Sequence, residues 1–598
     1  MCGIAGYVDN AGVKKSVLQS MSDEIAHRGP DGAGEYISPD GTVGFSHRRL
    51  SIIDLSERGA QPMSNEDGSI WITYNGEIYN FPGIRKYLVD KKHIFKSKSD
   101  TEVIIHAYEE WGIECINRLN GIFAFAIYDM KRKIVFLGRD RFGVKPLYYG
   151  LFDNNIFIFA SEIKAILKHP SFKKEINWQA VGDYFKYRYI PSPRSIWENI
   201  FKLEHGFYAY YSLTDKQFKK TRYYDLPRAV RNKKITSLDE VKTGFEQAVK
   251  SQMVSDVELG TFLSGGIDSS SVSAIAHTFN PKIKSFSIGF EPLEHSELRY
   301  SELVANYIGT KHITRVIDDL PEDIIEKNAY YYDEPLADSS CLPTFILSEM
   351  TAGYLKVVLS GDGGDEVFGG YNWYDTYLLD YRNYFNSCFS RVKSLFSKTR
   401  VLPDFEKYYN RLLLNRFNEN VFKNLFMPDI FDKVFDKDEN LYEKYASSDF
   451  KCVKSIQYID MNTFMVDDIL VKVDRASMAH SLEVRVPFLD HEFVESVLCL
   501  PEKIYPSDST GKPVLKKLMK GSLPDEIFSR SKQGFSAPLN KWKGFSSISE
   551  EIANGFLIKD AVININFIEE LKEQKYMNSD AIMWMIFIFE KWYQRWGR

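Results

Sequence analysis

Short stretches in which apolar and polar positions alternate recur through the first 215 residues of the chain. They lie at residues 70–74, 122–128, 134–137, 156–160 and 207–211. Alternation with a period of two is typical of strands that bury one face. Two segments with helical spacing, 17–27 and 101–111, fall between these strands. The pattern predicts a layered α+β domain built on antiparallel sheets.

The pattern changes after residue 215. Residues 216–232 are rich in Lys, Arg and Tyr, and a helical pattern follows over 237–254. Apolar strands then recur at 258–263, 285–290 and 357–359, with the spacing of a parallel α/β sheet. We predict a first domain over 2–215, a linker over 216–236 and a second domain over 237–598. Helical additions are expected in 372–455 and near 581–596, the latter as a packing helix.

Composition narrows the class of protein. A chain of 598 residues is too long for one hydrophobic core. Its net charge of −5 gives no electrostatic case for a nucleic-acid partner or an anionic membrane. The six cysteines form no C-x-x-C pair, and the eleven histidines show no metal-ligand spacing. The longest apolar run, 582–589, is far shorter than a membrane span of about 20 residues, and no signal-peptide pattern is found. We expect a cytoplasmic protein.

The first candidate for chemistry is Cys2. If Met1 is removed, Cys2 carries a thiol and a free α-amine on one carbon. The α-amine titrates at roughly 7.7–8.0, so it can act as the base for its own thiol at neutral pH. Gly3 lets the backbone pass close to a substrate. Cys2 is therefore predicted to be a nucleophile that needs no histidine.

Six motifs in the first domain follow one another in a fixed order. They are Cys2-Gly3-Ile4, the RGPDG turn at 28–32, residues 48–52, Asn75-Gly76-Glu77, residues 99–102 and residues 138–143. Together they resemble the class II glutamine amidotransferase domain, which has the N-terminal-nucleophile fold of four layers (αββα). The resemblance implies that Asn75 and Gly76 form an oxyanion hole beside the catalytic Cys2. It also implies that Arg49 holds the glutamine carboxylate and that Asp100 and the Glu77 region hold the α-ammonium group. The implied glutamine-binding residues are Arg49, Leu50, Ser51, Ile52, Ile53, Asn75, Gly76, Glu77 and Asp100.

After its first helix, the second domain has an apolar strand, a Ser264-Gly265-Gly266 loop and a helix of small residues. This order exposes backbone N–H groups at a helix N-terminus, where anions bind. It lacks the G-x-x-x-x-G-K-[ST] pattern of a Walker A loop. It resembles the pyrophosphate loop of the ATP pyrophosphatases, which cleave ATP between the α and β phosphates. The implied ATP-binding residues are Leu263, Ser264, Gly265, Gly266, Asp268, Ser269, Ser270, Ile288, Ser360 and Gly361.

Acidic residues follow the strand at 357–359, at Asp362, Asp365 and Glu366. Acids that face a triphosphate are costly unless a metal ion lies between them. We therefore expect Mg²⁺ to bridge Asp268 and Asp365 to the phosphates. Asp362 and Glu366 are candidates for the synthetase chemistry itself.

A dense motif at 473–490, with residues 531–535, extends the resemblance to the family of glutamine-hydrolysing asparagine synthetases. The likeness is firm over 2–167, 258–371 and 460–538. It implies transfer of glutamine nitrogen to aspartate through an acyl-adenylate, with release of AMP, pyrophosphate and glutamate. It also implies an internal passage for ammonia from Cys2 to Asp268, to which residues 122–125 and 486–489 could contribute. A homodimer is compatible with it.

The sequence departs from the enteric-type enzymes of this family in two places. Arg475 takes the position of a lysine in the dense motif, and Lys472 lies one helical turn earlier. Either residue is a candidate for the role of that lysine. The segment at 331–340 is acidic and contains no arginine to pair with a second carboxylate of the acceptor.

Three alternatives to aspartate amidation stay open on the sequence. The acceptor could be another carboxylate, such as a sugar uronic acid in surface-polysaccharide synthesis. Adenylation could close a ring within one substrate, as in β-lactam synthetases, but the intact Cys2 argues against this. A non-enzymatic nucleotide-sensing protein is the third alternative, and the occupied catalytic positions argue against it.

Overall fold

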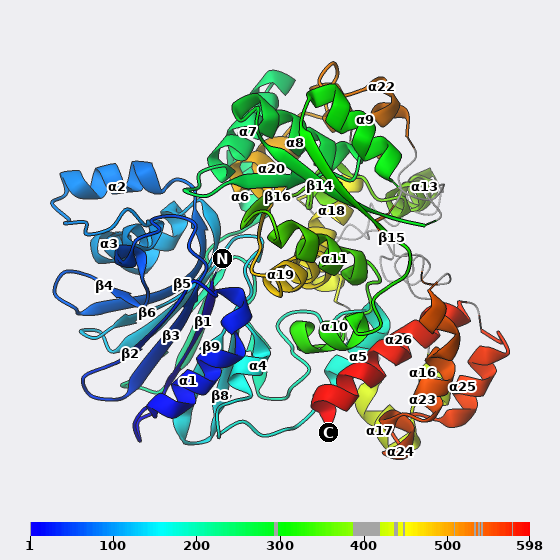
Figure 1. Cartoon of the computed structure of the whole chain (residues 1–598), viewed down its shortest axis with the longest axis horizontal. Helices are drawn as coiled ribbons and strands as arrows, with labels where there is room; N and C mark the ends of the chain where they lie inside the picture. Colours follow the sequence, from blue (N-terminus) through cyan, green and yellow to red (C-terminus); the bar gives the residue numbers. More distant parts are fainter. Residues whose placement is uncertain are drawn as a thin grey trace.

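Twelve strands in the first 222 residues form two antiparallel sheets in the computed structural model (Figure 1). The first sheet has the order β10-β8-β9-β1-β3-β2, and the second has the order β12-β11-β7-β6-β5-β4. The strands are β1 (Gly3–Val8), β2 (Gly32–Ile37), β3 (Val43–Arg49), β4 (Met63–Ser64), β5 (Ile70–Ile78), β6 (Gly121–Asp129), β7 (Ile134–Arg139), β8 (Tyr148–Phe152), β9 (Ile156–Ala160), β10 (Ile200–Lys202), β11 (Phe207–Ser212) and β12 (Phe218–Arg222). The five predicted strands are β5, β6, β7, β9 and β11, and they are confirmed.

The structure describes residues 2–291, 297–386, 419–435, 441–445, 449–506, 509–530, 534–535, 539, 542–576 and 578–598. Part of the predicted helical stretch at 372–455 and residues 531–533 of the predicted motif lie outside the described residues.

Helices cover the outer faces of the two sheets. Apolar residues of both sheets, such as Ile4, Phe45, Leu137 and Phe159, are fully buried between them. The first sheet packs against α1 (Lys15–Glu24) and α4 (Ile163–Ile166), and the second packs against α2 (Phe81–Asp90) and α3 (Asp100–Trp111). The alternating strands therefore bury both faces, and the layers follow the predicted order αββα.

The predicted linker at 216–236 contains regular structure. It holds β12, which pairs with β11 at the edge of the second sheet, and α6 (Leu226–Asn232). The strand β12 has the sequence FKKTR, whose last four residues are exposed. Charged side chains are tolerated on an edge strand because one side of it faces solvent. The charged composition of β12 therefore resembles that of a linker.

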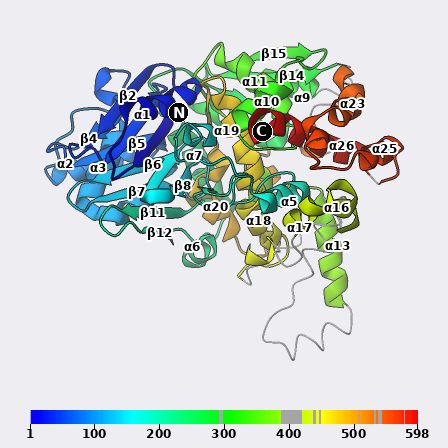
Figure 2. The same cartoon turned by 90° about the horizontal axis from the view of Figure 1, so that it is seen from below.

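A five-stranded parallel sheet forms the centre of the second half, in the order β15-β14-β13-β16-β17. Its strands are β13 (Leu259–Phe262), β14 (Lys284–Phe290), β15 (Lys311–Ile317), β16 (Val357–Leu359) and β17 (Glu483–Arg485). The helices in this half are α7 (Leu238–Gln252), α8 (Ile267–Phe279), α9 (Leu298–Ile308), α10 (Ile324–Tyr332), α11 (Cys341–Ala352), α12 (Gly364–Phe368), α13 (Trp373–Asn386), α18 (Val453–Asn462), α19 (Leu470–Met478), α20 (His491–Leu498), α21 (Pro513–Leu518) and α22 (Asp525–Ser529). The predicted α/β parallel-sheet domain with helical additions is thus present, and α13 extends away from the body of the molecule (Figure 2).

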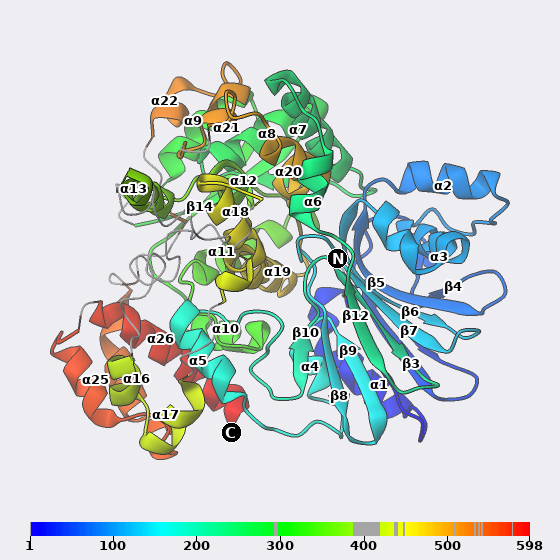
Figure 3. The same cartoon turned by 180° about the vertical axis from the view of Figure 1, so that it is seen from behind.

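A group of helices near the C-terminus packs around a segment from the first half. Figure 3 shows α5 (Trp178–Tyr187) beside α26 (Ser579–Trp592), the predicted packing helix. The hydroxyl of Tyr184 in α5 donates a hydrogen bond of 2.8 Å to the carbonyl of Met585 in α26. The other helices here are α16 (Glu419–Leu425), α17 (Pro428–Val434), α23 (Ile548–Ala553), α24 (Phe556–Lys559) and α25 (Ile565–Lys572). Residues 178–187 therefore belong by packing to the second half, although they precede β12. Among the described helices, none is both long enough and apolar enough to cross a bilayer.

Candidate functional site

Cys2 immediately precedes β1, and 9% of its surface is exposed. Its backbone nitrogen donates a hydrogen bond of 2.9 Å to Oδ1 of Asn75, and its Sγ lies 4.0 Å from the carbonyl oxygen of Leu50. Burial raises the pKa of the Cys2 thiol. A thiol in this position needs a base to become a nucleophile. Removal of Met1 would make the nitrogen beside Asn75 a free amine on the same residue.

Asn75 and Gly76 lie within β5 and not in a hairpin turn. Asn75 is fully buried, its Oδ1 is bonded to Cys2, and its Nδ2 has no hydrogen-bond partner in the described part of the chain. Gly76 has a φ of +155°, and a Cβ at this position would lie 2.1 Å from the carbonyl oxygen of Ile122. The backbone at Gly76 therefore requires glycine. The Nδ2 group of Asn75 is a buried hydrogen-bond donor that no group of the described residues uses.

The predicted glutamine-binding residues surround this point. Arg49 ends β3 and donates hydrogen bonds to the carbonyl oxygens of Ser56 (2.8 Å) and Asp54. Asp100 is buried at the start of α3 and accepts hydrogen bonds from the Tyr74 hydroxyl (2.8 Å) and the Ile78 N–H (2.9 Å). Burial raises the pKa of Asp100.

The remaining predicted residues connect the site to its surroundings. The Ser51 N–H donates to Asp31 at 2.7 Å, and the Ile52 carbonyl accepts from the N–H of Asp256 at 3.0 Å. Leu50 is buried, and Ile53 is half-buried. Glu77 forms an ion pair of 3.3 Å with Arg485 from β17. Burial and the neighbouring Glu483 raise the pKa of Glu77.

A buried network of charges joins the surroundings of Cys2 to the second half of the chain. Nε of Arg28 donates to the Cys2 carbonyl at 3.1 Å, and its Nη1 bonds Glu162 (2.7 Å) and Asp474 (2.8 Å). Arg475 continues the network, with its Nη1 2.9 Å from Glu162 and its Nη2 3.4 Å from Asp333. Arg28 is fully buried and Arg475 is 1% exposed. Buried charges are tolerated only when they are paired as these are.

A cavity of about 660 Å³ opens at the carboxyl ends of the parallel strands, where ligands bind in open α/β sheets. Of the predicted ATP-binding residues, Leu263, Ser264, Gly266, Asp268, Ser269, Ser360 and Gly361 line this cavity. Gly265, Ser270 and Ile288 are not among its lining residues. Gly265 instead lets the loop approach α9, because a Cβ there would lie 2.5 Å from the backbone nitrogen of Ser301. Asp362, Asp365, Glu366 and Lys472 also line the cavity, as do Gly534 and Phe535 of the second predicted motif.

The predicted metal ligands Asp268 and Asp365 both contact Nζ of Lys512. The distance to Asp365 is 2.6 Å. Although burial opposes the charge, the two carboxylates raise the pKa of Lys512 to about 12. Asp268 and Asp365 therefore converge on one position between the two strand-end loops, where a cation fits. Both offer oxygen ligands, which Mg²⁺ prefers.

A second charged group lies at another part of the cavity wall. Lys472 in α19 donates to the Ser340 hydroxyl at 2.8 Å and forms an ion pair of 3.3 Å with Asp338. Arg188, which follows α5 with a φ of +73°, also lines the cavity. Its Nε has no hydrogen-bond partner within the described residues. Although burial opposes the shift, Lys472 and Arg188 together lower the pKa of Asp338.

The two candidates for the family lysine thus lie in different surroundings on α19. Lys472 reaches the cavity, whereas Arg475 lies in the buried network between the two halves. The helix therefore connects the two sites, because one turn separates the residue in the cavity from the one that contacts Glu162.

Sequence reasoning missed several of these residues. Arg188 precedes the predicted linker, and Lys512 lies between two motifs without belonging to either. Arg28 stands inside the RGPDG motif, and its charge in a glycine-rich turn was the one available signal. Glu162 had no distinguishing pattern, and Asp333 was noted only as part of the acidic segment at 331–340.

Comparison with known proteins gives two matches to family models. Residues 240–594 match the asparagine synthase family, and residues 1–224 match the glutamine amidotransferase domain. Asparagine synthetase (glutamine-hydrolyzing) 1 of Bacillus subtilis strain 168 is 32% identical over 637 residues, covering 99% of this chain and 96% of that protein. A putative asparagine synthetase (glutamine-hydrolyzing) 2 of Methanocaldococcus jannaschii is 38% identical over 528 residues, covering 82% of this chain and all of that protein.

Proposed function

Because the chain belongs to the family of glutamine-hydrolysing asparagine synthetases, we propose that it transfers the amide nitrogen of glutamine to the side-chain carboxylate of aspartate. ATP is converted to AMP and pyrophosphate, and glutamine to glutamate. The observation that carries the proposal is the pair of sites on one chain: a buried thiol beside an unpartnered amide donor, and a cavity with paired carboxylates at the strand ends.

In the first half-reaction, the Cys2 thiol attacks the amide carbon of glutamine. The α-amine of the processed Cys2 takes the thiol proton and passes it to the leaving ammonia. Nδ2 of Asn75, with the N–H of Gly76, donates hydrogen bonds to the oxyanion that develops on the amide oxygen. Water then hydrolyses the thioester to glutamate and regenerates the thiol. The buried, unpartnered Nδ2 supports this role for Asn75.

Arg49 and Asp100 are the proposed holders of the two charged groups of glutamine. The planar guanidinium of Arg49 can bind the α-carboxylate with two parallel hydrogen bonds. Asp100 supplies a buried carboxylate for the α-ammonium group, next to the strand that carries Asn75.

In the second half-reaction, an oxygen of the acceptor carboxylate attacks the α-phosphorus of ATP and pyrophosphate leaves. The Ser264-Gly265-Gly266 loop and the N-terminus of α8 supply N–H donors for the phosphates. Ammonia then attacks the activated carbonyl carbon, and AMP leaves with the oxygen that joined it to the acyl group. Lys512 and Lys472, which line the cavity, supply positive charge for these steps.

Asp268 and Asp365 are the residues that would hold Mg²⁺. Both carboxylates already face one position that a cationic group occupies. When bound, the ion would neutralise charge on the phosphate oxygens.

Aspartate as acceptor is supported by the charges at the cavity wall. An amino acid with two carboxylates needs a cation for the α-carboxylate and an anion for the α-ammonium group. Arg188 and Asp338 are suited to these tasks, and Lys472 lies beside Asp338 for the carboxylate that reacts. The arginine that the segment at 331–340 lacks is thus available from the end of α5. A uronic acid has no ammonium group, so it would add no partner to those that Asp338 already has in Lys472 and Ser340.

We also propose that ammonia passes between the sites inside the protein, since free ammonia in water becomes ammonium. Buried apolar residues from both halves lie in one cluster, among them Leu50, Ile122, Val486 and Phe488. They would supply apolar surface for such a passage.

The test is a product assay with glutamine, ATP and a panel of carboxylic acids. With aspartate we expect AMP, pyrophosphate, glutamate and asparagine in equal amounts. A chain that forms AMP only with a uronic acid would replace aspartate by that acceptor. Cys2→Ala is expected to lose glutamine hydrolysis and to keep synthesis from ammonium salts. Glutamate release at the wild-type rate by this variant would refute the role of the thiol.

A further inference from the structure

Four potential metal ligands meet near the surface of the first half of the chain, outside both sites described above. They are Glu66, His93, His106 and Glu109, and one donor atom from each lies within 4.8 Å of all the others. Glu66 lies in the turn between β4 and β5, His93 follows α2, and the other two lie one turn apart on α3. The two histidines are thirteen positions apart in the sequence. The sequence therefore showed no metal-ligand spacing, although the fold brings these four residues together.

The distances within the cluster suit a small metal ion. Nδ1 of His106 lies 2.6 Å from Oε2 of Glu109 and 3.8 Å from Oε2 of Glu66. Nδ1 of His93 lies 3.5 Å from the same Glu109 oxygen. Ligand atoms about 2.0–2.2 Å from a tetrahedral ion are separated by roughly 3.4 Å. The donors therefore need only small side-chain movements to surround one ion.

Each imidazole has a carboxylate on the side opposite the cluster. Nε2 of His93 is 3.5 Å from Glu110, and Nε2 of His106 is 3.9 Å from Glu102. Glu102 is itself fixed by hydrogen bonds of 2.7 Å from the backbone of Lys96 and from Ser97. A carboxylate behind a histidine is the usual arrangement at zinc sites, since it holds the ring with its other nitrogen facing the metal.

The two glutamates of the cluster are also held by their second oxygen. Oε1 of Glu109 accepts from Nδ2 of Asn65 at 2.7 Å, and Oε1 of Glu66 accepts from the N–H of Ile94 at 3.0 Å. Both glutamate ligands are therefore held by hydrogen bonds, and each imidazole has a second carboxylate nearby. Carboxylates also outnumber the imidazoles around this point, which favours a cation there.

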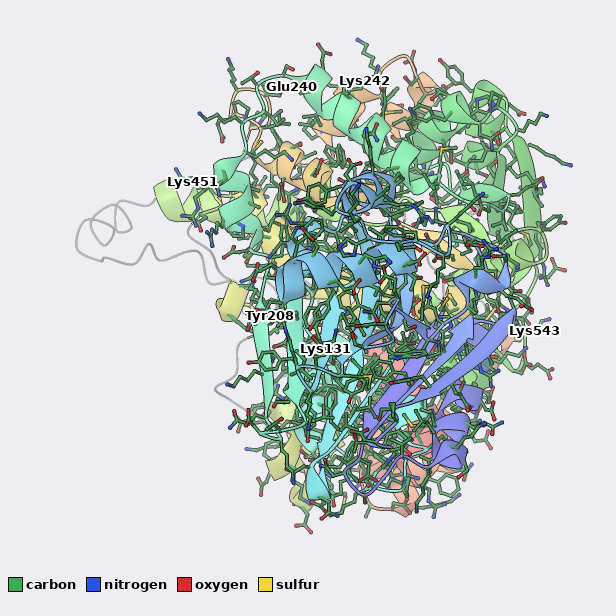
Figure 4. The ribbon with its side chains drawn as sticks, turned by 90° about the vertical axis from the view of Figure 1, so that its left-hand side faces the viewer. Lys131, Tyr208, Glu240, Lys242, Lys451 and Lys543 are labelled. Carbon is green, nitrogen blue, oxygen red and sulfur yellow. The ribbon has the colours of Figure 1, made fainter. Side chains whose placement is uncertain are left out.

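The cluster is open to solvent on one side. The side chain of His106 is 1% exposed, that of His93 16%, that of Glu109 21% and that of Glu66 33%. Figure 4 faces this side of the molecule and labels Lys131, whose Nζ pairs at 2.8 Å with Asp67, the residue after Glu66. A metal ion can enter from this face.

We propose that Glu66, His93, His106 and Glu109 form a Zn²⁺ site. Two imidazoles with two carboxylates suit Zn²⁺, whereas Mg²⁺ and Ca²⁺ take oxygen ligands only. The ion ties α3 to the β4–β5 turn and to the segment after α2. The first residue of α3 is Asp100, about 9 Å along the helix from His106, so the site also steadies the helix that carries this carboxylate.

The test is Zn²⁺ binding by the full chain, without an affinity tag, after removal of metals. Competition with a chromogenic chelator is expected to give one tight site per chain, and Co²⁺ is expected to give the visible absorption of a tetrahedral complex. His93→Ala and Glu66→Gln change partly exposed side chains, and each is expected to weaken binding at least 100-fold. Glu102→Gln is expected to weaken it roughly 10–100-fold, as for other residues behind a ligand.

The controls are His277→Ala, which removes a histidine outside the cluster, and Cys2→Ala, which removes a thiol of a type that can bind metals. Both are expected to bind Zn²⁺ as the wild type does. Circular dichroism of each variant shows whether it is folded. A wild-type chain without a tight Zn²⁺ site, or equal affinity in folded His93→Ala and Glu66→Gln, would overturn the proposal. The glutaminase assay is not needed for this test, so it stands apart from the proposed function.

Discussion

The side chain of Asn75 offers the sharpest test of the proposed glutaminase site. Its Oδ1 holds the nitrogen of Cys2 at 2.9 Å, and its Nδ2 is buried without a partner. Asn75→Ala removes both groups. Loss of one oxyanion-hole donor lowers kcat by about 10²–10³, or about 2.7–4 kcal/mol of transition-state stabilisation. Because Oδ1 also orients the base, we expect the loss for Asn75→Ala to lie at the upper end of this range.

The assay measures glutamate release from glutamine and, separately, asparagine formation from ammonium. We expect kcat for glutamate release to fall about 1,000-fold with little change in KM, because the oxyanion exists only in the transition state. Synthesis from ammonium is expected to stay at the wild-type rate. Thr73→Val is the matched control, since Thr73 is a buried residue of the same strand that bonds the Ser46 carbonyl at 3.1 Å. A loss below about fivefold in Asn75→Ala, or a parallel loss of synthesis from ammonium, would refute the reasoning.

Three further variants test the synthetase half and its connection to Cys2. Burial and the neighbouring Asp365 raise the pKa of Glu366 from its usual 4.5 to about 7. Between these two pH values the Glu366 carboxyl is protonated in the folded protein and ionised in the unfolded one. The free energy of unfolding therefore falls as pH rises through this window. Glu366→Gln should therefore raise the thermal unfolding temperature at pH 8, by the equivalent of at most about 3 kcal/mol, with no gain near pH 4.5; calorimetry at the two pH values decides. Lys512→Met removes the ammonium group that contacts Asp268 and Asp365, and we expect ATP–pyrophosphate exchange measured with Mg²⁺ present to fall about 100-fold while glutamate release is unchanged; equal exchange in both proteins would contradict the role of Lys512. Arg475→Lys keeps the charge but loses the planar fork, so we expect less asparagine per glutamate released with each half-reaction intact, and an unchanged product ratio would show that Arg475 serves stability alone.

The strands of the two antiparallel sheets could be predicted where alternation was strong, as in β5 and β6. The strand β1, with the sequence GIAGYV, gave no such signal because two glycines and an alanine interrupt its large apolar residues. The edge strand β12 was read as a linker because its lysines face solvent. Local pattern therefore finds strands rich in large apolar residues, such as β6, and it fails where small or charged residues interrupt the run.

The candidate sites were predictable where chemistry depends on consecutive residues. The Ser264-Gly265-Gly266 loop and Asn75-Gly76 are set by backbone geometry over a few positions, so motif order was enough to find them. Arg188, Lys512 and His93 come to their places through packing between distant segments, which no local spacing reveals. The choice between Lys472 and Arg475 likewise depended on which side of α19 faces the cavity.

The central claim is that the two sites of this chain act as one enzyme, with nitrogen passing inside the protein. The most direct measurement uses glutamine labelled with ¹⁵N in its amide group, together with aspartate, ATP and an excess of unlabelled ammonium. The account predicts that the new amide of asparagine carries ¹⁵N in nearly the proportion of the glutamine supplied, with one AMP formed for each asparagine. An asparagine amide whose ¹⁵N content is diluted by the unlabelled ammonium, or formation of ADP in place of AMP, would contradict the account.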